Sequence, residues 1–173
     1  YVERTPDFWE LYSTSTDRGV GSTDMMGMTT YRMLDNLDNL KTERTAQLDL
    51  GFQAEQGAWS AWASAYAGLI KDFILLEYNT PTMRQPLARN VDATIAGAEA
   101  GLGYQFTDHF QADISTMYAW GENTSDHRAL PQIAPLEGRL NLRYVDEKYS
   151  LGLLWRAVAK QNRISLNEGN VVG

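Results

Sequence analysis

The fold of this chain is decided by the stretch Ala46-Gln47-Leu48-Asp49-Leu50-Gly51-Phe52-Gln53-Ala54-Glu55, in which apolar and polar residues alternate. Such alternation places successive side chains on opposite faces of a β-strand. A shift of one residue would move Asp49 and Glu55 to the apolar face, so the register of the strand is strongly specified. The stretch therefore predicts a strand with one apolar face and one polar face.

Five further runs of this kind extend the pattern along the chain. The predicted strands cover residues 41–55, 59–78, 90–106, 110–120, 136–144 and 149–160. Residues 1–4 are expected to end an earlier strand, and the alternation blurs at 70–73, which predicts a bulge or the membrane boundary. The breaks are alternately short and long, as in barrels with short periplasmic turns and long external loops. The predicted fold class is therefore all-β, an antiparallel transmembrane β-barrel.

Composition excludes several other classes of protein. The 173 residues carry a net charge of -7, so there is no basic surface for nucleic acid. No run of about 18 apolar residues is present, which argues against a transmembrane helix but not against a barrel. The chain has no cysteine, which excludes disulfides and thiolate metal sites.

The two predicted faces favour a membrane barrel over a soluble one. Aromatic residues collect near strand ends, as an interfacial girdle does, at Phe52, Trp59, Tyr104, Phe106, Phe110, Trp120, Tyr144 and Tyr149. The opposite face carries Asp49, Glu55, Glu99, Asp113, Glu137, Arg139, Arg143 and Arg156. So many charges suit a watery lumen or a polar partner better than a dry core. A soluble lipocalin-like barrel or β-sandwich is the alternative, but several predicted strands exceed the usual length of about 5 or 6 residues.

Four segments resemble motifs of TonB-dependent outer-membrane receptors. Arg4, Pro6, Glu10, Leu11 and Tyr12 match the pattern R-x-P-x-x-x-E-L-Y. Residues 40–45 resemble L-K-P-E-x-S/T, with Thr42 where proline is usual, and residues 90–99 resemble N-x-x-x-A-x-I-x-G-x-E. Residues 130–135 resemble L-P-x-I-P-P, with Ala134 at the first of the paired prolines. The segments occur in the family's order and span nearly the whole chain.

The resemblance implies a barrel of about 22 strands with an N-terminal plug. Residues 1–173 are then a fragment containing about seven strands, and the plug domain and the TonB box lie outside it. The resemblance further implies a bacterial outer-membrane receptor that is no enzyme and that works with TonB, ExbB and ExbD. Residues 59–78, 121–135 and 161–164 look most like the copper-receptor branch, so copper is the expected cargo.

Methionines supply the candidate metal ligands. Met25, Met26, Met28 and Met33 lie in a predicted external loop, and His127 lies in another. Thioether sulfur is a soft ligand that selects Cu(I) over hard cations. Methionine also fills irregular gaps between loops, and the resemblance implies that most copper ligands lie outside this segment.

Other functions stay open at the level of sequence. The same type of receptor imports iron-siderophores or cobalamin, and a passive porin or an adhesin barrel has similar strands. Ser125, Asp126 and His127 are the residues closest to a hydrolytic set, but adjacent residues on one loop rarely form a triad, and no G-x-S-x-G motif is present.

Overall fold

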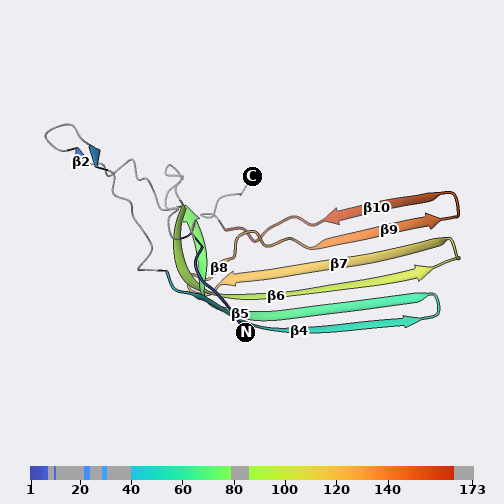
Figure 1. Cartoon of the computed structure of the whole chain (residues 1–173), viewed down its shortest axis with the longest axis horizontal. Helices are drawn as coiled ribbons and strands as arrows, with labels where there is room; N and C mark the ends of the chain where they lie inside the picture. Colours follow the sequence, from blue (N-terminus) through green and yellow to red (C-terminus); the bar gives the residue numbers. More distant parts are fainter. Residues whose placement is uncertain (8–9, 11–21, 24–28, 31–39, 79–85, 166–173) are drawn as a thin grey trace.

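The computed structural model describes residues 1–7, 10, 22–23, 29–30, 40–78 and 86–165, and they form an antiparallel sheet (Figure 1). Its strands follow in the order β1 (Val2–Arg4), β4 (Glu43–Gln56), β5 (Trp59–Tyr78), β6 (Pro86–Gln105), β7 (Phe110–Asn123), β9 (Glu137–Val145) and β10 (Ser150–Val158). The short β8 (Arg128–Ala129) pairs with β7, and β2 (Ser22–Thr23) pairs separately with β3 (Thr29–Thr30). The predicted all-β class and the count of about seven strands are confirmed.

Cross-strand register builds two continuous faces. Leu50 pairs with Ala65, which pairs with Ala98, and Ala98 pairs with Tyr118. Residues of this set form the apolar face, where side chains such as Leu50 are exposed by 68%. The adjacent row joins Gly51, Ser64, Glu99, Met117 and Glu137 on the polar face. Residues that are direct cross-strand partners lie on the same face of a sheet, so this register confirms the predicted assignment of the two faces.

Most predicted strand boundaries differ from the observed ones by one or two residues, and two are wrong by more than that. β6 begins at Pro86 instead of residue 90, because Tyr78 and Pro86 still face each other in the ladder with β5. Proline is tolerated as the first residue of a strand, where its missing N–H removes little pairing. β7 continues to Asn123 instead of ending at residue 120, because β8 returns beside it and pairs with its last two residues.

The predicted bulge in β5 is confirmed and bends the sheet. The ladder with β6 shifts register between Ile70 and Phe73, and Asp72 has φ 57°. Beyond this point the ends of β5 and β6 turn away from the direction of the other strands (Figure 1). A bulge increases local bending, which allows these ends to leave the plane of the sheet.

An apolar core covers the polar face at this end of the sheet. Buried Ile70, Ala93 and Leu130 form its centre. Phe73, Ile95 and Ile133 are partly buried against it. The segment 130–135 therefore folds against strands β5 to β7, on the face that is polar elsewhere. No helix within the described ranges is long and apolar enough to cross a membrane.

Aromatic side chains gather at the opposite end, beside the short turns. The ring centroids of Trp59 and Tyr104 are 4.4 Å apart, and those of Tyr104 and Phe106 are 4.8 Å apart. Phe106 and Phe110 follow at 5.3 Å, across the turn between β6 and β7. Spacings of this size give favourable aromatic packing, and rings at strand ends suit an interfacial girdle.

Candidate functional site

Asn90 joins three segments at the long-loop end of the sheet. Its side-chain oxygen accepts a hydrogen bond from the Lys41 amide at 2.7 Å, and its amide nitrogen donates to the Lys41 carbonyl at 3.1 Å. The same nitrogen donates to the carbonyl of Asp72 at 2.6 Å. One side chain therefore satisfies backbone groups of the bulge and of the segment that leads into β4.

A second cluster forms around Arg4. Its guanidinium donates to Glu10 at 2.9 Å and to Glu43 at 3.1 Å. Asp7 and Glu10 exchange two hydrogen bonds of 2.8 Å, each from a backbone amide to the other's carboxylate. This reciprocal pattern is a capping box with aspartate in place of serine or threonine, and it fixes the chain as it leaves β1.

The turn between β7 and β8 is built on two polar side chains. Asn123 is 2% exposed, and its side-chain oxygen accepts hydrogen bonds from the amides of Ser125 and Asp126 at 3.0 and 3.1 Å. The Asp126 carboxylate pairs with Arg89 on β6. The hydrogen bond from Arg89 lowers the pKa of Asp126 below its ordinary value. The turn is thus attached to the bent end of β6.

Acidification is expected to release this attachment. Because the folded-state pKa of Asp126 is depressed, the ion pair stabilises the folded state fully above the unfolded pKa of about 4 and loses its effect as pH falls below that value. The thermal unfolding temperatures of wild type and Asp126→Asn should therefore differ at neutral pH and converge at the acid end. A difference that is the same at every pH would contradict the role given to this carboxylate.

The three residues closest to a hydrolytic set, Ser125, Asp126 and His127, each lie next to different partners. Ser125 accepts a hydrogen bond from the Asp92 amide at 2.9 Å, and Asp126 binds Arg89 and Asn123. His127 lies 4.0 Å from the carboxylate of Glu122. A triad needs its three side chains in one chain of hydrogen bonds, so this arrangement does not support nucleophilic catalysis.

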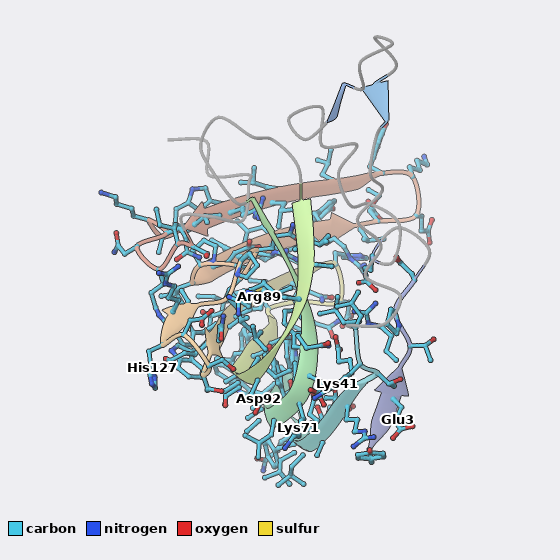
Figure 2. All side chains as sticks on the ribbon, turned by 90° about the vertical axis from the view of Figure 1, so that its left-hand side faces the viewer. Glu3, Lys41, Lys71, Arg89, Asp92 and His127 are labelled. Atoms are coloured by element: carbon cyan, nitrogen blue, oxygen red, sulfur yellow. The ribbon has the colours of Figure 1, made fainter. Side chains whose placement is uncertain are left out.

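Of the five candidate metal ligands, the structure describes one, His127. Met25, Met26, Met28 and Met33 lie outside the described residues. His127 is described: its side chain is 86% exposed, and it projects from the edge of the molecule in Figure 2. In the described part of the chain, no three His, Asp or Glu residues lie close enough to hold a metal ion. The assignment of these five residues as ligands stays a prediction.

The polar face holds a charge cluster between β9 and β10. Arg139 and Arg156 are direct cross-strand partners, so their like charges would repel. Both donate hydrogen bonds of 2.5 Å to Glu137, one to each carboxylate oxygen. The Glu137 side chain is 7% exposed. Glu137 thus bridges the two arginines and offsets their repulsion, which favours a structural role for these charges over contact with a cargo.

A family model and several solved structures relate this chain to known proteins. A family model described as "TonB dependent receptor-like, beta-barrel" matches residues 2–172. This chain belongs to the TonB-dependent receptor β-barrel family. A solved structure titled "Copper transporter OprC" is 45% identical over 99% of this chain, with a TM-score of 0.80. The match covers 24% of that chain, so the present sequence spans about a quarter of its length.

A second solved structure shares the fold at lower sequence identity. The FrpB iron transporter from Neisseria meningitidis is 22% identical over 69% of this TonB-dependent receptor barrel chain and 18% of its own, with a TM-score of 0.51. At this identity the likeness concerns the fold alone. No curated protein sequence matches the chain.

The four family motifs have structural roles in this TonB-dependent receptor barrel. Arg4 of the first motif pairs both with Glu10 of the same motif and with Glu43 of the second. Asn90 of the third motif binds the backbone of Lys41 in the second, and Leu130 of the fourth is in the buried core. The motifs therefore mark residues that fasten the long-loop end of the wall.

Proposed function

We propose that this chain is part of the wall of a bacterial outer-membrane receptor that imports copper. The main support is the 45% identity, over 99% of this chain, to the solved structure titled as a copper transporter. The continuous apolar face also suits contact with lipid, and the polar face suits a hydrated interior. The energy for transport would come from TonB with ExbB and ExbD, acting through parts of the receptor outside this chain.

Within this function, the wall positions the external loops that capture the cargo. The clusters around Arg4, Asn90 and Asp126 fix the strand ends from which those loops leave. We place Met25, Met26, Met28 and Met33 in a loop of this kind, because soft thioethers bind Cu(I). Copper is thus the proposed cargo, and no step of its transport requires catalysis by this segment.

Copper content of the full-length receptor tests the proposal. Receptor purified from outer membranes of cells grown with added copper is expected to hold a stoichiometric amount of the metal. Changing Met25, Met26 and Met28 together to leucine should reduce it, because leucine keeps the volume but removes the sulfur ligands. Met117→Leu is the matched control, since Met117 lies on the polar face in the middle of β7.

Each outcome has a distinct meaning. Copper that is bound equally by the triple variant keeps the function and assigns these methionines to packing. A receptor that binds no copper under any condition overturns the copper proposal and favours an iron-siderophore or cobalamin receptor with the same barrel.

A further inference from the structure

The sheet has a gap beside the outer end of β7. The ladder between β7 and β9 ends where Met117 faces Glu137, and β8 pairs only with the last two residues of β7. In the described part of the chain, residues 118–121 of β7 therefore have no strand beside them on this edge. A backbone hydrogen bond crosses the gap, from the Leu130 amide to the Gly121 carbonyl at 3.2 Å. An unpaired strand edge presents backbone donors and acceptors, so this edge needs another cover.

Two irregular segments cover the gap. Segment 130–135 lies on the polar face, where a side chain on Gly121 would collide with Ile133. Residues 159–163, here called the strap, follow β10 and run beside the chain that leads into β9, joined to it by a backbone hydrogen bond of 2.8 Å. The Gln161 side chain of the strap donates to the Ile133 carbonyl at 2.5 Å. Figure 1 shows the two segments passing together toward the outer end of β7.

Arg163 fastens the strap on the apolar side of the sheet. Trp120 faces Ala96 in the ladder with β6, so its ring belongs to the apolar face. The Arg163 guanidinium carbon lies 4.7 Å from the centroid of this ring, and a guanidinium nitrogen lies 3.5 Å from the Glu122 carboxylate. A planar guanidinium suits both contacts, because it stacks on aromatic rings and pairs with carboxylates. The strap is thus held to the polar-face segment by Gln161 and to the apolar face by Arg163.

A cavity of about 190 Å³ remains between these segments. It is lined from β7, β8, segment 130–135 and the strap, by residues that include Ala119, Gly121, Ala129, Ile133 and Gln161. The strap therefore covers the gap without filling it. A segment that has few contacts and borders a cavity opens locally at low cost.

We propose that the strap is a latch that closes the gap beside β7, and that Arg163 is the residue that fastens it. In the closed position, the strap separates the apolar side from the cavity and from segment 130–135 on the polar face. When Arg163 leaves Trp120 and Glu122, the strap moves away and the cavity opens to the outside. The latch therefore controls access from the side to the interior of the barrel, whatever the cargo is.

The test is the accessibility of a cysteine placed in the cavity of the full-length receptor. Ala129 lines the cavity and is partly buried, and cysteine adds little volume there. The measurement is the rate at which a water-soluble maleimide labels Ala129→Cys, with the receptor lacking this change as the blank. The rate is expected to rise about ten-fold when Arg163→Gln is added, because a cation–π contact and an ion pair are lost together.

Two further variants separate the contacts of the strap. Trp120→Leu removes the ring but leaves Glu122, so the rate should rise by less than with Arg163→Gln. Combining the two changes should add nothing to Arg163→Gln, because that change alone already removes both contacts. Lys160→Gln is the matched control, since Lys160 is an exposed cation of the same strap that makes none of the fastening contacts. It should leave the rate unchanged.

Hydrogen exchange on the same samples distinguishes release of the strap from loss of the fold. With Arg163→Gln, the amides of the strap should exchange faster, whereas those of Ile70 and Ala93 in the buried core should not change. Faster exchange at Ile70 and Ala93 as well would show that Arg163 stabilises the whole end of the sheet, and the latch would be wrong.

Two outcomes of the labelling experiment also overturn the proposal. Equal rates with and without Arg163→Gln would mean that Arg163 does not hold the gap closed. An equal increase with Lys160→Gln would mean that any loss of charge from the strap exposes the cavity, so that no specific fastening by Arg163 exists.

Discussion

Arginine in place of Ala65 is expected to lower the free energy of unfolding of the full-length receptor by about 2–4 kcal/mol. Ala65 is in the middle of β5 on the apolar face, where its direct partners are Leu50 and Ala98. A charge at this depth would have to enter hydrocarbon or draw water and headgroups toward it. The measurement is guanidinium unfolding of the receptor in lipid vesicles, followed by tryptophan fluorescence.

The neighbouring residue provides the control. Ser64 pairs with Gly51 and Glu99 on the polar face, so arginine there meets water and a carboxylate. Ser64→Arg should therefore leave the unfolding free energy nearly unchanged. Equal losses at the two positions would show that the two faces do not differ in environment, and the membrane orientation of the sheet would be wrong.

Leu130→Ala is expected to cost about 2–5 kcal/mol, the range for emptying a buried leucine site. Leu130 is 4% exposed and packs with Ile70 and Ala93 at the centre of the core on the polar face. The cavity would loosen segment 130–135 from the bent ends of β5 and β6. Besides the unfolding free energy, hydrogen exchange of the amides around Ile70 and Ala93 should become faster.

Leu136→Ala is the matched control for this core. Leu136 belongs to the same connection between β8 and β9, but it is 48% exposed and lies beside Tyr118 and Ala98 on the apolar face. Its loss removes little packing, so the effect should be clearly smaller. If Leu136→Ala were as destabilising as Leu130→Ala, the core would not be what holds this segment.

The local sequence determined the strands, their faces and the order of turns. Alternation with a period of two is a property of neighbouring residues, so Leu48, Leu50 and Phe52 could be assigned to one face from sequence alone. The same holds for the bulge near Asp72, where the alternation fails. The motifs around Arg4 and Asn90 further indicated the family, although sequence did not show that these residues contact other motif segments.

Only the tertiary structure decided which side chains meet. Asn90 binds Lys41 across 49 positions of sequence, and Arg44 faces Lys71 although neither position alone predicts the pair. The strand ends at Pro86 and Asn123 were likewise set by pairing partners that local propensity does not contain. Cross-strand neighbours depend on the register of a whole ladder. Hairpin turns set this register, and a bulge shifts it for all residues that follow. The period of a strand therefore specifies its faces, whereas the contacts on those faces are specified by the sheet.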